Sequence, residues 1–183
     1  MPEYRRIYHN GGIYFFTLVT YQRRPIFSVP ISRNILLDSL ERTQKFHPFT
    51  NLAYCLLPDH LHFLWQMPEN DSAYSMRISL LKSYFTKKYK QIFPGESLRS
   101  ESRTKRRESN VWQRRFWEHV IRDQEDFNQH MDYIHYNPVK HGLVTSPSEW
   151  ESSSFLHFVN EGIYASDWGK TIKMKDQKIK FGE

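Results

Sequence analysis

The chain has little cysteine and no long apolar segment. Its 183 residues include one cysteine, Cys55, which excludes an internal disulfide and any zinc cage built from several cysteines. No apolar run approaches the roughly 20 residues that a membrane span requires. The first residues, "MPEYRRIYHNGG", also have no apolar centre of the kind that secretory signals contain. These absences predict a cytosolic protein with no membrane partner.

Positive charge is abundant and unevenly distributed. The chain has 26 Lys and Arg against 20 Asp and Glu, a formal net charge of +6. Between Arg99 and Arg115, seven basic residues face two acidic ones, a balance of +5. The aromatic residues Trp112, Phe116 and Trp117 lie within or just after this segment, so bases could stack where phosphates are held. A solvated loop is the alternative, but nucleic acid is the partner that the pattern favours.

Three segments rich in β-branched and aromatic residues predict strands, at 13–20, 49–57 and 60–67. Only Pro58-Asp59, a turn pair, separates the last two, which predicts a hairpin. The stretch 111–121, "VWQRRFWEHVI", fits either a short strand or irregular structure.

Apolar spacing predicts three helices. The first spans 30–46. The second ends at Pro94-Gly95 and carries an apolar stripe of Ile78, Leu81, Phe85, Tyr89 and Ile92. The third begins after the capping residue Asp123 and stops before Pro138. The order of elements predicts an α+β fold, an antiparallel sheet with helices packed on it, open to the ferredoxin-like arrangement.

The stretch "LPDHLHFLW" places His60 and His62 two positions apart in a predicted strand. Strand side chains alternate between faces, so both imidazoles point to one face, about 7 Å apart along the strand. They could converge on one cation. Chance is the alternative, because the chain has nine histidines. A metal site would also need ligands on another rigid element.

The last predicted helix offers such groups. His130, Tyr133 and Asn137 are one turn apart and share a face. That face lies about a quarter turn from the apolar stripe of the helix, so Tyr133 is expected at the rim of the core, along the sheet surface. A half-buried tyrosine with its hydroxyl in water is the alternative. An activated tyrosine oxygen can attack phosphorus, while a cation on two histidines would polarise the phosphate.

At these residues the chain resembles a known family. "PDHLHFLW" resembles the His-hydrophobe-His motif of the HUH single-strand nucleases. Val111 to Val144, with "DYIHYNPVKHG" inside it, resembles the REP-associated tyrosine transposases, a bacterial branch of the single-tyrosine transposases. The likeness runs from about Tyr4 to Trp168, and the basic loop and the last residues are its loosest parts.

The resemblance implies one HUH transposase domain with a ferredoxin-like α+β fold over residues 1–168, with a basic loop at 94–111 and a charged tail at 169–183. It implies cleavage and rejoining of single-stranded DNA at palindromic, REP-like hairpins through a 5′-phosphotyrosine, with Mg²⁺ or Mn²⁺ as cofactor. Related single-tyrosine transposases act as dimers, whereas this branch is expected to act as a monomer. The expected location is the bacterial cytoplasm, in association with the nucleoid.

Carried over by position, His60 and His62 are expected metal ligands and Tyr133 the nucleophile. Asn137 falls where related enzymes place a glutamine as third ligand. Tyr136 is the competing nucleophile, but it lies about 300° around the helix from Tyr133, off the face that carries Asn137. Imidazoles favour Zn²⁺, Ni²⁺ or Cu²⁺ over Mg²⁺, and Mg²⁺ often uses substrate phosphate as a ligand, so the ion is expected to bind well only with DNA.

The candidate DNA-binding residues are basic or aromatic and come from the amino terminus, the second helix and the basic segment. They are Tyr4, Arg5, Arg6, Lys87, Lys88, Arg103, Lys105, Arg106, Arg107, Arg114 and Arg115. Arginine suits guanine edges, and the alternatives are phosphate contact or mere solubility. The neighbouring His119, His130, Lys140 and His141 carry no chemical assignment, and structural roles or DNA contacts are favoured over metal ligation.

Three functions remain open from the sequence. The first is a metal-dependent transposase that forms a covalent phosphotyrosine. The second is a domesticated hairpin-binding protein that no longer cuts DNA. The third, a metallohydrolase of small phosphoesters, requires neither the basic loop nor a covalent adduct.

Overall fold

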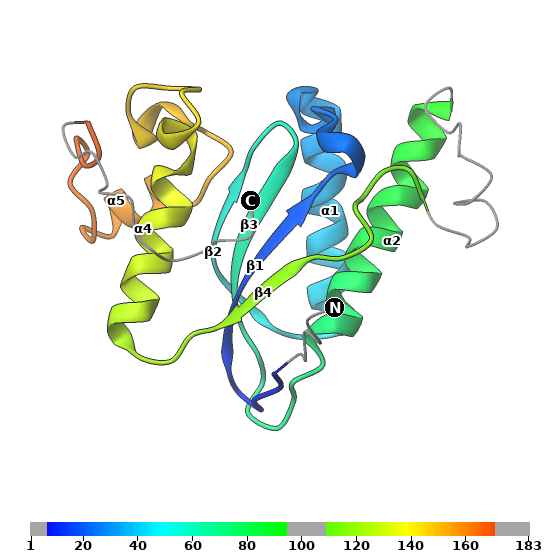
Figure 1. Cartoon of the computed structure of the whole chain (residues 1–183), viewed down its shortest axis with the longest axis horizontal. Coiled ribbons are helices and arrows are strands. Elements are labelled where there is room, and N and C mark those ends of the chain that lie inside the picture. The colour runs from blue at the N-terminus through cyan, green and yellow to red at the C-terminus, as the bar shows by residue number, and fades with distance from the viewer. Residues whose placement is uncertain (1–6, 95–108, 171–183) are drawn as a thin grey trace, which may run out of the picture.

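The computed structural model describes residues 7–94 and 109–170, and its sheet is flanked by helices on both sides (Figure 1). The strands are β1 (Ile13–Val19), β2 (Thr50–Leu56), β3 (His60–Gln66) and β4 (Trp117–Val120). The α-helices of the described residues are α1 (Pro30–Phe46), α2 (Tyr74–Ile92), α4 (Gln124–Lys140) and α5 (Phe155–Asn160). All strand pairs are antiparallel, in the order β2-β3-β1-β4. With the chain order βαββαβ, this is the ferredoxin-like arrangement that the sequence predicts.

The sheet is buried on both faces, which explains its continuous apolar strand sequences. Along β1, Tyr14 and Phe16 pack in the cluster under α1 and α2, while Phe15 between them packs in the cluster under α4. Helices α1 and α2 lie together on one side of the sheet, and α4 lies on the other (Figure 1). Because α4 packs over β2 and β3, residues of β3 that face it meet residues of α4.

Helices α1 and α2 agree with the sequence prediction. Helix α1 has the predicted bounds, with Pro30 in its first turn. The apolar stripe of α2 is buried from Ile78 through Tyr89, while Ile92 at its end is exposed. Within the described ranges, no helix is long and apolar enough to cross a lipid bilayer.

The predicted stop of the third helix before Pro138 is wrong. Asp123 caps the helix as expected, and its side chain accepts a hydrogen bond from the Asp126 N–H at 2.8 Å. The helix then continues through the buried Pro138 to Lys140, and the His141 N–H donates to the Asn137 carbonyl at 3.0 Å. Proline removes one backbone hydrogen bond and crowds the carbonyl four residues before it, yet Pro138 is buried and the helix ends only two residues later. Lys140 is therefore helical, two turns beyond Tyr133.

Candidate active site on the α4 face of the sheet

Two buried histidines of β3 face α4 side by side. His60 and His62 are 1 % and 0 % exposed. Their ring centroids are 5.2 Å apart and their planes are inclined at 82°. The expectation that both imidazoles share one face is confirmed. Lone pairs of histidine nitrogens lie in the ring plane, so two inclined rings at this separation can direct nitrogens toward a common point.

Each histidine has its Nδ1 held by a neighbouring polar group. The Nδ1 of His60 lies 2.6 Å from Oδ1 of Asp59, and the Nδ1 of His62 lies 3.0 Å from Oγ1 of Thr17. An ionised carboxylate only accepts hydrogen bonds, so His60 donates through Nδ1 and Nε2 is the nitrogen that can bind a cation. Metal-bound histidines are commonly oriented in this way by a second group. The donor set therefore suits a divalent cation.

Asp59 is ionised in this arrangement. Burial opposes ionisation of its carboxyl, but hydrogen bonds from His60 and from Arg23, whose Nη1 is 3.1 Å from Oδ2, outweigh burial and lower the pKa. Asp59 and Thr17 are functional candidates that the sequence analysis missed. Asp59 reads as a turn residue, although it directly precedes His60. Thr17 becomes relevant only because β1 pairs with β3 in a register that places it opposite His62.

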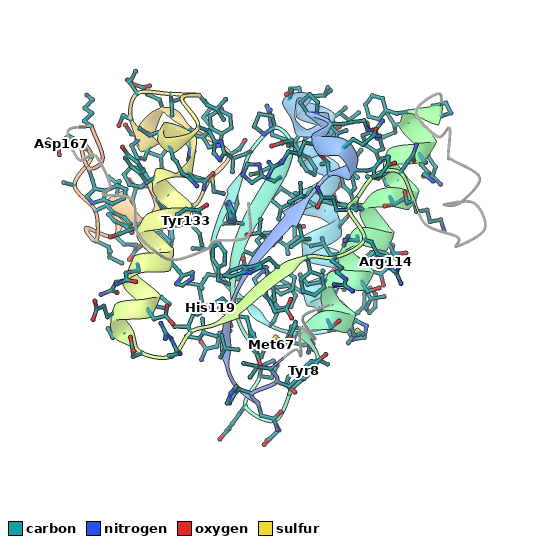
Figure 2. The ribbon with its side chains drawn as sticks, in the orientation of Figure 1. Tyr8, Met67, Arg114, His119, Tyr133 and Asp167 are labelled. Atoms are coloured by element: carbon teal, nitrogen blue, oxygen red, sulfur yellow. The ribbon has the colours of Figure 1, made fainter. Side chains whose placement is uncertain are left out.

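Tyr133 projects from α4 toward the sheet (Figure 2). Its ring centroid is 5.3 Å from that of His62, with the planes at 71°, and the side chain is 4 % exposed. The Lys140 Nζ donates a hydrogen bond to the Tyr133 hydroxyl at 3.0 Å. The alternative of a half-buried tyrosine with its hydroxyl in water is therefore wrong, because ring and oxygen both have protein neighbours.

The two remaining candidates on α4 point in different directions. Asn137 is fully buried, one turn beyond Tyr133 on the same helix face. Tyr136, the competing nucleophile, has its ring 6.3 Å from that of Trp168, in the C-terminal part of the described chain. The arrangement brings Tyr133 to the histidine pair and turns Tyr136 away from it.

His141 and Lys140 also reach the site, although no chemical role was predicted for either residue. The exposed His141 has its ring centroid 5.0 Å from that of His60. Both residues follow Asn137 within about one turn, a spacing that would have indicated proximity. The expected stop at Pro138 concealed this signal, because it ended the helix before either residue.

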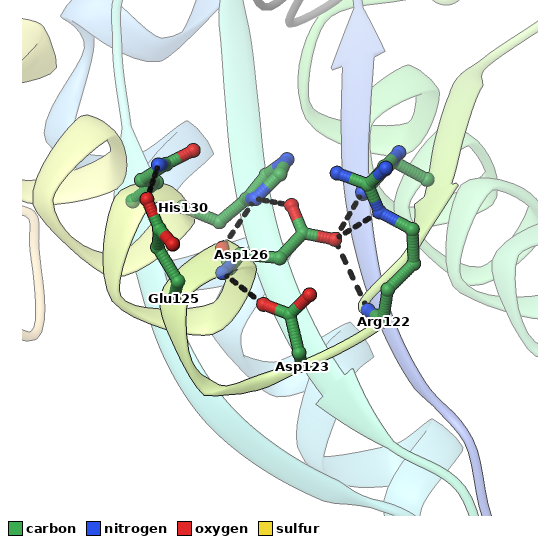
Figure 3. Close-up of polar contacts among 7 residues, drawn as sticks. Arg122, Asp123, Glu125, Asp126 and His130 are labelled. Carbon is green, nitrogen blue, oxygen red and sulfur yellow. Dashed lines mark hydrogen bonds and ion pairs between the residues drawn. The ribbon is translucent and has the colours of Figure 1, made fainter.

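His119, Asp126 and His130 form a second cluster, where β4 leads into α4. Oxygens of Asp126 meet the Nε2 of His119 at 2.8 Å, the Nδ1 of His130 at 3.1 Å and the Nε of Arg122 at 3.0 Å. Figure 3 shows this carboxylate between Arg122 and His130. Burial opposes ionisation of Asp126, but hydrogen bonds from Arg122 and His119 lower its pKa to about 2. The carboxylate thus ties β4 to the first turn of α4.

The same cluster could supply three ligand atoms to a metal, since these lie within 4.8 Å of one another. The ring geometry argues against coordination. The rings of His119 and His130 are stacked, 4.6 Å apart and inclined by only 12°, so their in-plane lone pairs run parallel and do not converge. The inclined pair His60 and His62 is the better cation site.

The predicted DNA-binding residues are dispersed. Tyr4, Arg5, Arg6, Arg103, Lys105, Arg106 and Arg107 lie outside the described residues. Lys87 and Lys88 are exposed on α2, in a groove with α1 on the opposite side of the sheet from the histidine pair. Arg114 and Arg115 are exposed just before β4, and Arg114 lies beside α2 (Figure 2). The structure brings none of these four cations to the histidines.

Comparison with known proteins gives concordant matches. The family model "Transposase IS200 like" matches residues 9–137. A protein of Haemophilus influenzae assigned to the REP-associated tyrosine transposases is 44 % identical, over 96 % of this chain and 97 % of its own. The REP-associated tyrosine transposase of Escherichia coli is 36 % identical, and the match covers 94 % of this chain and 93 % of the E. coli protein.

A solved structure agrees with these sequence matches. It is described as a REP-associated tyrosine transposase bound to a REP hairpin, and it superposes with a TM-score of 0.79 at 34 % identity, covering 100 % of this chain and 98 % of the other. The fold is therefore the HUH fold that the sequence predicts. The chain belongs to the IS200-like transposases and, within them, to the REP-associated tyrosine transposases.

Proposed function

We propose that this protein is a metal-dependent transposase that cleaves and rejoins single-stranded DNA at palindromic hairpins through a 5′-phosphotyrosine. The observation that carries the proposal is the approach of Tyr133 to His62, 5.3 Å between ring centroids, beside the inclined imidazole of His60. Membership of a transposase family, which implies DNA cleavage and transfer, supports it. A nucleophile and a cation site then lie side by side on the α4 face of the sheet.

Each residue of the site has a distinct role in this proposal. His60 and His62 would hold a Mg²⁺ or Mn²⁺ ion, and Asn137 would add its amide oxygen. Such an ion would supply Lewis-acid stabilisation of the charge at the scissile phosphate. Asp59 fixes the orientation and tautomer of His60, and Thr17 fixes the orientation of His62. Tyr133 supplies the attacking oxygen.

The proposed reaction has two reversible halves. In cleavage, the Tyr133 hydroxyl gives its proton to water and its oxygen bonds to phosphorus, while the bond from phosphorus to the 3′ oxygen breaks and the 3′ oxygen takes up a proton from water. In joining, a 3′ hydroxyl attacks the phosphotyrosine and Tyr133 leaves. The phosphotyrosine linkage is itself a phosphodiester, so the free energy of the broken DNA bond is kept in it. Joining therefore requires no nucleotide cofactor.

The proposed partner is hairpin DNA with adjoining single strand. A relative at 34 % identity is described as bound to a REP hairpin, and the basic residues named above provide phosphate contacts. We further propose a monomer acting in the bacterial cytoplasm with the nucleoid, and one transposase domain over residues 1–168 followed by a charged tail.

The test uses labelled single-stranded oligonucleotides that carry a palindromic hairpin flanked by every possible tetranucleotide. The full chain is incubated with this library and Mg²⁺ or Mn²⁺, and the products are separated on a denaturing gel. A protein–DNA adduct that is absent with Tyr133→Phe and present with Tyr136→Phe supports the proposal. Adduct formation by Tyr133→Phe would contradict the nucleophile assignment, and hairpin binding without any adduct would favour the domesticated binding protein.

A further inference from the structure

Lys140 is in direct contact with the proposed nucleophile. Its Nζ donates to the Tyr133 hydroxyl at 3.0 Å and lies 4.7 Å from the centroid of the Tyr133 ring. The two residues are seven positions apart on α4, two turns along one face. The contact depends on the helical course through Pro138, since a helix ending before that proline would not place Lys140 above Tyr133.

The position of Lys140 matches the charge that the reaction creates. A tyrosine oxygen gains negative character as its proton leaves for attack, and again when it departs from phosphorus during joining. A positive donor already aimed at that oxygen interacts more strongly with the charged form than with the neutral phenol. An interaction that is stronger in the transition state than in the ground state accelerates the step.

We infer that Lys140 is a catalytic residue, whose ammonium group stabilises the Tyr133 oxygen as it attacks phosphorus and as it leaves. In cleavage, the phenol proton passes to water, the Tyr133 oxygen bonds to phosphorus, the 3′ oxygen departs and water returns a proton to it. In joining, these events run in reverse, with the departing oxygen held by the same ammonium. This inference rests on the proposed phosphotyrosine chemistry.

The competing explanation is that Lys140 contacts a DNA phosphate and contributes only to binding. The two roles differ in what they change. Loss of a phosphate contact lowers hairpin affinity and the salt dependence of binding, and leaves the rate at saturating DNA unaltered. Loss of a contact with the reacting oxygen lowers the rate at saturating DNA and leaves hairpin affinity unaltered.

The test compares Lys140→Met, Lys140→Arg and the control Lys45→Met. Lys45 is an exposed lysine in the last turn of α1, on the opposite side of the sheet. The rate of adduct formation is measured under single-turnover conditions at saturating DNA. The substrates are hairpin oligonucleotides that the wild-type protein cleaves. We expect Lys140→Met to slow cleavage by about 100-fold, as for loss of one oxyanion donor, while Lys140→Arg recovers most of the rate. Joining, measured by adding a 3′-hydroxyl strand to isolated adduct, should slow by a similar factor.

A measurement without DNA keeps this inference separate from the proposed function. The protein is labelled with ¹³C at the tyrosine ring carbon that bears the oxygen and is studied by NMR. The Tyr133 resonance is identified as the one that disappears in Tyr133→Phe. It should shift in Lys140→Met and remain in place in Lys45→Met. A wild type that forms no adduct overturns the proposed function. An unshifted resonance, or wild-type cleavage and joining rates in Lys140→Met, overturns the role of Lys140.

Discussion

Replacement of Asp126 by asparagine should destabilise the protein in a pH-dependent manner. The carboxylate lies in the first turn of α4 and accepts hydrogen bonds from His119 on β4 and from Arg122. These partners hold its pKa at about 2 in the folded state, against 3.8 ordinarily. Asp126→Asn removes the charge while keeping the shape of the side chain.

The magnitude follows from this difference in pKa. A tenfold change in an equilibrium constant is roughly 1.4 kcal/mol, so ionised Asp126 contributes about 2 kcal/mol to the free energy of unfolding near neutral pH. Because the folded pKa is the lower one, the contribution is present above the unfolded pKa and is lost as the pH falls from about 4 to about 2. About half should remain at pH 3.

The assay is urea unfolding followed by tryptophan fluorescence at pH 6 and pH 3, with Asp38→Asn as the control. Asp38 is exposed on α1, so its variant should match wild type. At pH 6, Asp126→Asn should lose about 2 kcal/mol, or about 4–8 °C in Tm for a chain of this size, and the loss should halve at pH 3. An equal loss at both pH values would refute the electrostatic reasoning, as would full wild-type stability at pH 6.

Three further outcomes are expected. Asp59→Asn should weaken Mn²⁺ binding by about 10–100-fold in calorimetric titration of the protein–hairpin complex, because His60 loses its orienting carboxylate; unchanged affinity would contradict the proposed cation site. Phe15→Ala should cost about 3–5 kcal/mol in thermal unfolding, because the fully buried ring packs against His62, His130 and Tyr133. Replacing Arg114 and Arg115 by alanine should reduce the slope of log hairpin affinity against log salt concentration by about two. An unaltered slope would show that neither arginine contacts a phosphate.

Local sequence signals were sufficient for most of the fold. The bounds of α1, the hairpin of β2 and β3, and the cap of α4 at Asp123 agree with prediction. Each depends on residues near one another in the chain, through apolar spacing, a turn pair or a capping carboxylate. The predicted helix end before Pro138 was wrong because a proline in the last turn costs the helix few hydrogen bonds. Packing of the whole helix against the sheet decides where the helix ends.

The site was predictable only in part. Alternation along a strand placed His60 and His62 on one face, and helical spacing placed Tyr133 and Asn137 on another. Neither pattern gives the distance between a strand and a helix. The identity of Asp59 and Thr17 as partners of the histidines required the β1–β3 register, and the contact between Lys140 and Tyr133 required the helix to pass Pro138.

The sequence by itself determined the chemistry available and the side of each element on which it lies, because residue type and backbone periodicity are local properties. It also determined the family, through motifs at characteristic spacing. Only the tertiary structure decided that the histidine pair of β3 meets the tyrosine of α4, that the stacked cluster of His119 and His130 is unsuited to a cation, and that Lys140 reaches the Tyr133 oxygen. Those outcomes depend on how two layers pack across the sheet, and packing is set by contacts between residues far apart in the chain.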